Sequence, residues 1–261
     1  MGSQKRSMGM HEPDPNPRHP ERPSSGSSIG NEHHFGSLKI LVVENLPDVV
    51  DSIVLWMTAR WRDSVLIVTG SGRDAIQIAQ TAAPDIVLLG LALADLYGLQ
   101  VLREIRSFSS MPVIMLSPSY EETTRLRSFG IGAIDYLVVS PFSPVELLGS
   151  INAALGHLGG SRRPHTQSLV INLARNNIFR TGVESSLTMA ESKVLTALLR
   201  NHGQTISYAQ LIQEGWREEA VTHSTLTLCI QQLRMKLGDD LEEPRLIHLQ
   251  RNAGYSLNLF G

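Results

Sequence analysis

The sequence predicts an α/β protein in which a doubly wound, five-stranded parallel sheet is followed by a smaller domain of a different kind. Short apolar runs of strand length alternate with helix-period segments over residues 37–158, which is the pattern of repeated βα units. Residues 168–261 instead begin with short alternating strands and continue with three helices and a hairpin. Small, basic and proline residues fill the stretch 159–167 between them, which is predicted to be a linker.

The first 36 residues are predicted to form a disordered tail. Residues 1–36 are rich in Pro, Ser, Gly, His and Asn and contain almost no apolar side chains. They bury too little surface to offset the entropy lost on ordering. Histidines 11, 19, 33 and 34 are irregularly spaced, which favours a solvated tail over a metal site.

Composition predicts a cytoplasmic protein with no membrane span. No apolar run approaches the ~20 residues that crossing a bilayer requires, and the N-terminus lacks the apolar core of a secretory signal. The single cysteine, Cys229, fits a reducing compartment. The net charge is −2, and residues 165–261 carry 9 Lys/Arg and 9 Asp/Glu. Charge alone therefore does not indicate nucleic-acid binding.

The first half repeats a strand, a loop and a helix five times. In Pro84–Arg106, for example, the apolar run Ile86–Leu89 is followed by a loop through Gly98 and then by helix-period apolar residues. Five such units running in one direction make a doubly wound parallel sheet. The predicted strands are Lys39–Val43, Val65–Val68, Ile86–Leu89, Val113–Leu116 and Tyr136–Val139, and the predicted helices are Asp48–Trp61, Gly72–Ala82, Leu99–Phe108, Glu121–Phe129 and Pro144–Leu158.

The second half predicts a helix-turn-helix with a flanking β-hairpin, which is a winged helix. Short alternating strands occupy Ser168–Thr188. Thr188 and Glu191 have the spacing of a capping box at the start of the first helix, and Gly238 is a typical helix stop. The predicted helices are Met189–Asn201, a second that Ser207 caps and that runs to Trp216, and a third from Thr222 or Ser224 to Leu237; the hairpin strands are Leu246–Leu249 and Tyr255–Leu259.

These two halves, in this order, resemble a response regulator of the OmpR/PhoB type. The receiver resemblance, which implies a flavodoxin-like fold, covers roughly residues 38–158, and the effector resemblance covers roughly 168–259. The stretches that carry it are ILVVENLPD, PDIVLLGLALADLYGLQVLREIR, MPVIMLSP, GAIDYLVVSPFSPVELL, LTMAESKVLTALLRNHGQTISYAQLI and CIQQLRMKLGDDLEEPRLIHLQRNAGYSL.

The resemblance implies a phosphoryl-accepting aspartate at the end of the third strand, but this chain has Gly90 there. The chemistry requires a carboxylate nucleophile, two acidic residues for Mg²⁺ and a lysine that screens the phosphoryl charge. The acidic pair falls on Glu44 and Asn45, and Ser140 stands before Pro141 where the family has its lysine. We therefore predict a degenerate receiver with no phosphoacceptor, no metal and no cofactor.

Two further positions of the receiver matter to this prediction. Asp95, in the loop after the third strand, is expected to be a solvated loop residue and not a substitute acceptor. Ser117 and Tyr136 fall on the switch hydroxyl and switch aromatic positions of the family. Three interpretations stay open: a receiver fixed in an active-like state, a pocket re-used for a small ligand or protein, and a structural dimerisation domain.

The family dimerises through its fourth helix, fifth strand and fifth helix, where Arg125, Asp135 and Glu146 match charge-pair positions. Ser150 replaces the arginine expected one turn after Glu146, so Asp135 has lost its usual mate. Exposed ion pairs contribute only ~0–1 kcal/mol each, so apolar contacts must carry the association. The apolar candidates are Leu126, Leu147, Ile151 and Leu155.

In a winged helix the third helix enters the major groove, and the hairpin reaches phosphate or the minor groove. Apolar residues repeat at helical spacing along the third helix and should face the core; they are Leu226, Ile230, Leu233 and Leu237. The residues that the resemblance implies for DNA binding are Trp216, Ser224, Thr225, Leu228, Gln231, Gln232, Arg234, Lys236, Arg251 and Tyr255.

The pair Gln231-Gln232 stands where the family usually carries two arginines. Glutamine can bond adenine N6 and N7 in a bidentate way, and Leu228 could touch a thymine methyl group. We therefore expect an A·T-leaning half-site. Fewer cations also mean fewer phosphate contacts, so binding should be weaker and less dependent on salt.

The sequence thus predicts a sequence-specific DNA-binding transcriptional regulator that acts as a constitutive or a ligand- or partner-controlled dimer. Its expected partners are double-stranded DNA, a second copy through the receiver, and RNA polymerase. The alternative is a receiver-derived interaction adaptor or small-ligand sensor with weak DNA affinity. No nucleophile–base pair or phosphate loop is visible in the sequence, so an enzyme is not expected.

Overall fold

The computed structural model describes residues 1–2, 38–156, 168–217 and 221–259. Most of the predicted tail and the whole of the predicted linker lie outside these ranges, so their state and the domain boundaries stay predictions. The described residues from 38 onward belong to one compact unit. Within these ranges, no helix combines the length and the apolar character that crossing a membrane requires.

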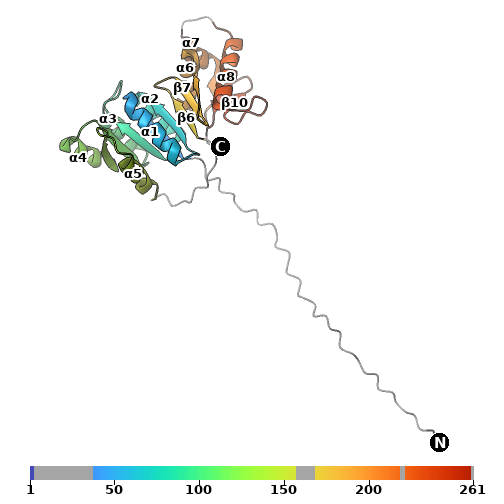
Figure 1. Cartoon of the computed structure of the whole chain (residues 1–261). Helices are drawn as coiled ribbons and strands as arrows, with labels where there is room; N and C mark the ends of the chain where they lie inside the picture. Colours follow the sequence, from blue (N-terminus) through green and yellow to red (C-terminus); the bar gives the residue numbers. More distant parts are fainter. Residues whose placement is uncertain (3–37, 157–167, 218–220, 260–261) are drawn as a thin grey trace. The chain divides into compact units, whose positions relative to one another are not determined.

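The first half is the predicted parallel sheet, which can be followed in Figure 1. Its strands lie in the order β5-β4-β3-β1-β2, and each pair of neighbours is parallel. Every residue of β2, β3 and β4 is buried, as expected for strands covered on both faces. The strands are β1 (Lys39–Val43), β2 (Val65–Thr69), β3 (Ile86–Gly90), β4 (Val113–Ser117) and β5 (Asp135–Val138).

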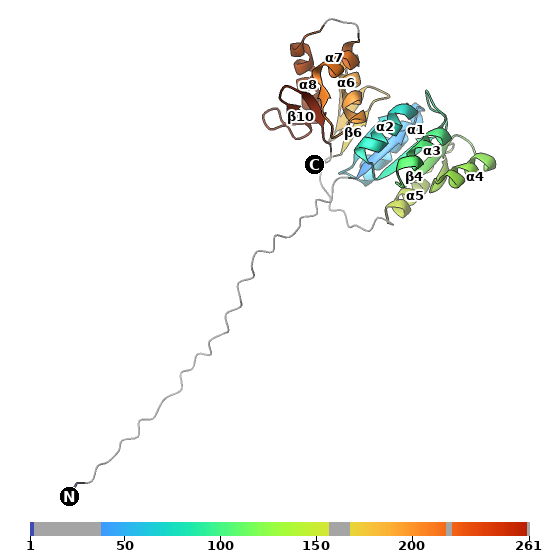
Figure 2. The same cartoon turned by 180° about the vertical axis from the view of Figure 1, so that it is seen from behind.

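Helices cover both faces of this sheet, also seen from behind in Figure 2. The buried side chains of α1 and α5 share one apolar cluster, whereas those of α2 and α3 belong to a second. The doubly wound arrangement is therefore confirmed. The helices are α1 (Pro47–Arg60), α2 (Gly72–Ala82), α3 (Gly98–Phe108), α4 (Glu122–Ile131) and α5 (Pro144–Gly156).

The second half has the predicted helix-turn-helix and hairpin. A strand that the sequence did not predict, β9 (Ile206–Ser207), pairs with the second strand of the hairpin, which is therefore the central strand of a three-stranded sheet. The two residues of β9 are too few for a period to be visible. The remaining elements are β6 (Leu169–Asn172), β7 (Asn177–Arg180), β8 (Val183–Ser186), α6 (Met189–Arg200), α7 (Tyr208–Trp216), α8 (His223–Leu237), β10 (Ile247–Gln250) and β11 (Gly254–Leu257).

The helix ends follow the sequence signals. Thr188 accepts a hydrogen bond from the Glu191 amide, and the Glu191 carboxylate accepts one from the Thr188 amide, which confirms the capping box. Ser207 and Gln210 repeat this arrangement at α7. Helix α8 begins after Thr222 and ends at Gly238, whose φ of 71° suits glycine.

The prediction of a five-stranded sheet is incomplete, because the observed sheet continues beyond β2. Strand β6 pairs with β2 in parallel, and β7 and β8 continue from it in antiparallel pairing to give one eight-stranded sheet. The sequence shows which segments are strands, but it does not show which strand closes an open sheet edge. The two predicted halves therefore share a sheet.

Asp239 joins the end of α8 to the start of the hairpin. Asp239 is 7% exposed, and its carboxylate accepts hydrogen bonds from the amides of Arg245, Leu246 and Ile247 at 2.6, 3.0 and 2.9 Å. One side chain thus satisfies three consecutive backbone donors and fixes where β10 leaves the helix.

Asp239→Ala should lower the free energy of unfolding by about 2–4 kcal/mol, because it removes a charged acceptor and leaves its partly buried donors unpaired. Chemical denaturation of the full chain would measure this. Asp240→Ala, which changes an exposed neighbour that bonds the amides of Glu242 and Glu243, is the matched control and should cost much less. Equal losses for the two variants would contradict the assigned role of Asp239.

Candidate functional site

The predicted receiver site lies around the end of β1, where the Glu44 side chain is buried. Glu44 is 4% exposed, and its Oε1 accepts hydrogen bonds from the amides of Asn45 at 2.8 Å and Leu46 at 2.9 Å. Leu46 is the N-cap residue of α1 and has no side-chain cap of its own, so Glu44 serves the start of this helix. Burial raises the pKa of Glu44, although the two backbone hydrogen bonds act in the opposite direction.

Gly90, the last residue of β3, lies directly against this carboxylate. A Cβ atom placed on Gly90 would lie 2.5 Å from Glu44 Oε2 and 3.1 Å from the Val43 carbonyl oxygen. Both distances are shorter than ordinary van der Waals contact. The space beside the strand end, where a side chain at position 90 would start, is therefore occupied by Glu44.

The other residues of the predicted site carry no charge. Asn45 and Ser140 are both exposed, and the Ser140–Pro141 peptide bond is cis. Val139, which precedes Ser140, is buried, and its amide donates a hydrogen bond to the Ser117 carbonyl. The described pocket thus has one buried carboxylate, Glu44, and no second charged group among the positions that the resemblance implied.

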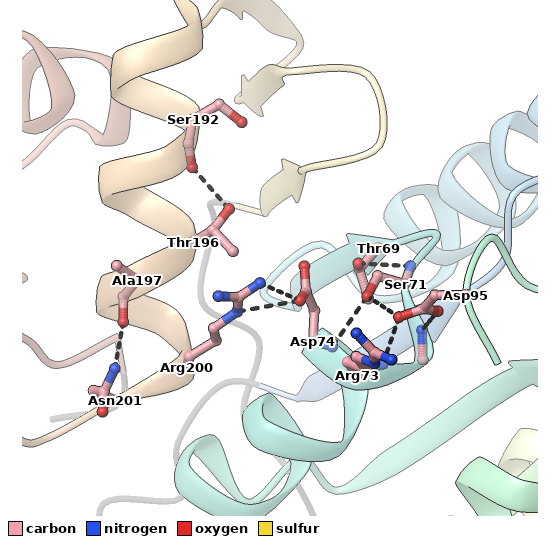
Figure 3. A network of polar contacts seen from close by, with 11 residues as sticks. Thr69, Ser71, Arg73, Asp74, Asp95, Ser192, Thr196, Ala197, Arg200 and Asn201 are labelled. Atoms are coloured by element: carbon pink, nitrogen blue, oxygen red, sulfur yellow. Dashed lines mark hydrogen bonds and ion pairs between the residues drawn. The ribbon is translucent and has the colours of Figure 1, made fainter. Parts of the chain in front are cut away.

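Asp95 has a structural role that the sequence analysis did not assign. Its carboxylate accepts hydrogen bonds from the Gly72 amide, the Ser71 hydroxyl and the Arg73 amide at 2.7, 2.9 and 3.2 Å (Figure 3). Partial burial would raise the pKa of Asp95, but these hydrogen bonds outweigh it and lower the pKa. Asp95 therefore stabilises the N-terminus of α2 and is not simply a solvated loop residue.

The two predicted switch residues, Ser117 and Tyr136, lie close to the same backbone carbonyl. Ser117 is 2% exposed and donates to the Ser119 carbonyl at 2.6 Å, and the Tyr136 hydroxyl lies 3.4 Å from the same oxygen. The Tyr136 ring is 7% exposed. The switch hydroxyl is thus bonded within its own loop, and the aromatic ring is packed inward.

The predicted dimer face presents Arg125 and Glu146 as exposed side chains. The Arg125 guanidinium lies 5.9 Å from the Tyr120 ring centroid and 5.3 Å from that of Phe129. The i+4 spacing of Phe129 in α4 is a sequence signal that could have indicated its contact, whereas Tyr120 precedes the helix and no period indicates its contact. Asp135 accepts a hydrogen bond from Ser150, so the residue that replaced the expected arginine has become its partner in the same chain.

The apolar part of the dimer prediction needs correction. Leu147 and Ile151 are fully buried and belong to the core under α5. Leu126 is 61% exposed, and Leu155 packs against the core while staying partly accessible. Of the four candidates, Leu126 alone is a largely exposed apolar side chain.

Helix α8 has the predicted division between a buried and an exposed face. The predicted core residues of α8 are all buried, and Cys229 joins them with its pKa raised to about 12 by burial. The positions on the opposite face are exposed, and they are Ser224, Thr225, Leu228, Gln231 and Gln232. This face carries hydrogen-bonding and apolar groups that suit base edges.

Two cations predicted to contact DNA are held inside the domain instead. Arg234 donates through Nε and Nη2 to the Ile247 carbonyl at 3.2 and 2.7 Å, and its side chain is 11% exposed. Lys236 Nζ lies 2.8 and 2.7 Å from the two carboxylate oxygens of Glu191. We therefore remove both from the candidate DNA surface. Their helical positions gave no sign of these distant partners.

The hairpin and the end of α7 supply the remaining candidates. Arg251 is exposed in the turn between β10 and β11. Tyr255 is 4% exposed and packs edge-on against the Tyr208 ring, so it supports the hairpin from within. Trp216 is partly buried against the core. Arg251 is thus the accessible cation of the predicted set.

Comparisons with known proteins agree with this two-part organisation. Residues 40–152 match the family model described as "Response regulator receiver domain", and residues 182–257 match "Transcriptional regulatory protein, C terminal". The Mycobacterium tuberculosis (strain ATCC 25618 / H37Rv) protein "Transcriptional regulatory protein KdpE" is 30% identical over 222 residues, which cover 83% of this chain and 97% of the relative.

Other relatives align over two thirds of this chain or more. "KDP operon transcriptional regulatory protein KdpE" of Escherichia coli (strain K12) is 33% identical over 69% of this chain and 82% of its own length. "DNA-binding response regulator MtrA" of Mycolicibacterium smegmatis is 29% identical over 83% and 95%. The solved structure of response regulator DrrB, described as a Thermotoga maritima OmpR/PhoB homologue, is 23% identical and covers 85% of this chain and 99% of its own, with a TM-score of 0.42.

The relatives bear the names of transcriptional regulators and not of enzymes. Both domain models match in the expected order, and the relatives align over most of their length. The chain therefore belongs to the OmpR/PhoB-type response regulators and combines a receiver domain with a winged-helix, DNA-binding transcriptional regulatory domain.

Proposed function

We propose that this chain is a sequence-specific transcriptional regulator whose receiver does not accept a phosphoryl group at position 90. It acts as a dimer through the α4-β5-α5 face, and its activity depends on a partner, a ligand or its own abundance. RNA polymerase is the further partner that a DNA-bound regulator of this kind would contact. The observation that carries the proposal is the Glu44 carboxylate beside Gly90.

The contact between Glu44 and Gly90 opposes phosphoryl transfer in two ways. Gly90 offers no oxygen nucleophile, and Glu44 Oε2 lies only 2.5 Å from where the Cβ atom of an acceptor side chain would be. A buried carboxylate whose Oε1 already accepts two amide hydrogen bonds is also a poor partner for Mg²⁺, which requires near-octahedral oxygen ligation. The pocket is thus filled from within the chain.

The switch residues support an active-like state that needs no phosphate. Tyr136 is buried, and its hydroxyl shares the Ser119 carbonyl with Ser117. In the family the switch hydroxyl meets a phosphoryl oxygen, whereas here a backbone carbonyl takes that hydrogen bond. Exposed Arg125, Leu126 and Glu146 leave the dimer face accessible to a second copy.

The exposed face of α8 supports DNA reading with few cations. Gln231 and Gln232 can bond adenine, Leu228 is 57% exposed and can contact a thymine methyl group, and Arg251 can reach phosphate. We therefore propose an A·T-leaning half-site and a shallow dependence of affinity on salt.

A second candidate function is an interaction adaptor with weak DNA affinity. The engagement of Arg234 and Lys236 within the domain favours it, because it leaves fewer cations for phosphate than the sequence suggested. Selection of bound sites from random DNA by the full chain separates the two functions. An enriched motif supports the regulator, and the absence of any motif supports the adaptor.

Incubation of the full chain with acetyl phosphate and Mg²⁺ should leave its intact mass unchanged. Gly90→Asp alone should also stay unmodified, because the new side chain meets Glu44 and the fifth loop offers no lysine to screen phosphoryl charge. Prompt mass spectrometry of both proteins would measure this. A phosphoryl group on the wild-type receiver would refute the proposal.

Glu44→Gln should raise the melting temperature relative to wild type increasingly as the pH rises from about 4 to about 7. Burial raises the pKa of Glu44 in the folded state. At a pH above the ordinary pKa of glutamate, ionisation of Glu44 therefore lowers the stability of the folded wild type. Glutamine carries no charge and does not have this cost. Both Oε1 hydrogen bonds can be kept by the glutamine oxygen. A melting-temperature difference that stays constant or falls across this range would contradict the assignment.

Gln232→Ala should relax base preference at about one position of the selected site, with a loss of about 1–3 kcal/mol of discrimination. Competitive binding of the full chain to single-base variants of that site would measure it. Thr227→Ala, at an exposed position of the same helix outside the candidate set, is the matched control and should leave the preference intact.

Arg251→Ala tests phosphate contact, in contrast to Gln232→Ala, which tests base reading. It should weaken binding to all sequences alike and reduce the salt slope by about one phosphate contact, while the selected motif stays the same. A changed motif in this variant, or an unchanged motif in Gln232→Ala, would overturn the division between base reading and phosphate contact.

A further inference from the structure

We propose that the receiver half and the winged-helix half are locked together by the β2–β6 pairing and an α2–α6 contact, so that they move as one body without a phosphoryl group or a metal ion. The lock uses neither the dimer face nor the exposed face of α8. Its consequence for DNA binding rests on the proposed function, whereas the lock itself does not.

The first component of the lock is backbone pairing along the edge of the receiver sheet. Residues Val65–Val68 of β2 pair in parallel register with Leu169–Asn172 of β6. The Leu169 amide donates to the Ser64 carbonyl at 3.0 Å, and the Leu173 amide donates to the Val68 carbonyl at 2.8 Å. An uncovered sheet edge exposes a row of unpaired backbone groups, and β6 satisfies those of β2.

The second component joins the first turn of α2 to the last turn of α6, as Figure 3 shows. Arg200 donates through both Nε and Nη2 to Asp74 Oδ1, with 3.1 Å from Nε. The side chains are only 32% and 15% exposed. An acidic residue near a helix N-terminus and a basic residue near a C-terminus also complement the helix dipoles, so this pair fits both helices.

The other end of α2 is fixed in the same way. The Thr81 hydroxyl donates to the Leu199 carbonyl at 3.1 Å, which satisfies an acceptor in the last turn of α6. His202, just beyond α6, hydrogen-bonds to the backbone of Thr81 and accepts from the Leu259 amide at 2.9 Å. Contacts at both ends of α2 restrict rotation of α6 against it.

The third component is apolar burial on both sides of β6. Val170 is 1% exposed and belongs to the cluster that contains Leu66 and Met57 of the receiver. Ile171 is fully buried in the other cluster, together with Ile67 of β2 and Leu198 of α6. Burial on both faces supplies the larger part of the stabilisation, and the polar contacts define the register.

The lock leaves the predicted dimer face and the predicted DNA-reading face of α8 exposed. Arg125, Leu126 and Glu146 stay exposed in the compact unit, as do Leu228 and Gln232 on α8. None of these residues takes part in the β2–β6 or α2–α6 contacts described above. The lock therefore fixes the winged helix on the receiver without covering the predicted DNA-reading positions.

Amide hydrogen exchange of the full chain tests the lock directly. The Leu169 and Leu173 amides should be protected in the wild type, and Arg200→Ala should make them exchange about three- to tenfold faster. The amides of Leu88 in β3 and Ala197 in α6 should keep their rates. Arg103→Ala, an exposed arginine on α3, is the matched control and should change none of them.

Exchanging the charges of Asp74 and Arg200 tests whether the ion pair itself is responsible for this protection. The double variant Asp74→Arg/Arg200→Asp should recover part of the protection that Asp74→Arg and Arg200→Asp each lose, because the restored ion pair is offset by unfavourable interactions with the two helix dipoles. Unchanged rates in Arg200→Ala, acceleration throughout the winged helix, or a wild-type lock that loosens on addition of beryllofluoride and Mg²⁺ would each overturn the proposal.

The DNA consequence is tested separately from the lock. Selection with the wild type should return one fixed half-site spacing, and Asp74→Ala/Arg200→Ala should broaden the spacing while keeping the half-site sequence. Unchanged spacing in the variant would overturn the coupling between lock and site geometry. Failure to select any motif would reject the proposed function, and the exchange rates would still decide the lock.

Discussion

The parallel pairing of β2 with β6 is the constraint on which the arrangement of the two halves depends. A doubly wound sheet buries its faces under helices but leaves its edge strands with unpaired backbone groups. Here β6 covers the β2 edge, and the apolar side chains of β6 enter the clusters on both faces. The relative placement of receiver and winged helix is therefore defined by strand register and packing.

A second constraint operates at the receiver pocket. Family receivers hold several carboxylates close together, and their mutual repulsion is relieved by Mg²⁺ and phosphorylation. With Gly90 and Asn45 in place, Glu44 has no acidic neighbour at these positions. Its carboxylate instead satisfies two amides at the start of α1. Glu44 thus has a structural role at the start of α1.

The sequence predicted the regular elements well because their signals are local. Alternation of apolar runs located the receiver strands, and Thr188 with Glu191 located the start of α6. The pattern also separated the buried and exposed faces of α8 correctly. In each case the information lies within a few residues along the chain, where the period of a helix or strand fixes the side-chain direction.

The predictions that needed correction concern partners distant in the sequence. Lys236 and Arg234 have the positions of exposed basic residues near a helix end, but their long side chains reach Glu191 and the Ile247 carbonyl. Leu147 and Ile151 are apolar residues at helical spacing, and that pattern is the same for residues that face the core of the domain and for residues that face another subunit. The continuation of the sheet through β6 depends on a pairing about a hundred residues apart, which no period reveals.

These corrections change how DNA binding must be achieved under the proposed function. Phosphate contacts supply a large share of the affinity of most DNA-binding proteins, and the exposed face of α8 holds Ser, Thr, Leu and Gln side chains at its candidate positions. One winged helix of this composition would bind weakly. Two winged helices held at a fixed separation gain affinity through effective concentration, without new contacts. That gain is greatest when each winged helix is fixed on its receiver and the receivers are fixed on each other. The locked sheet and the dimer face would then compensate together for the missing cations.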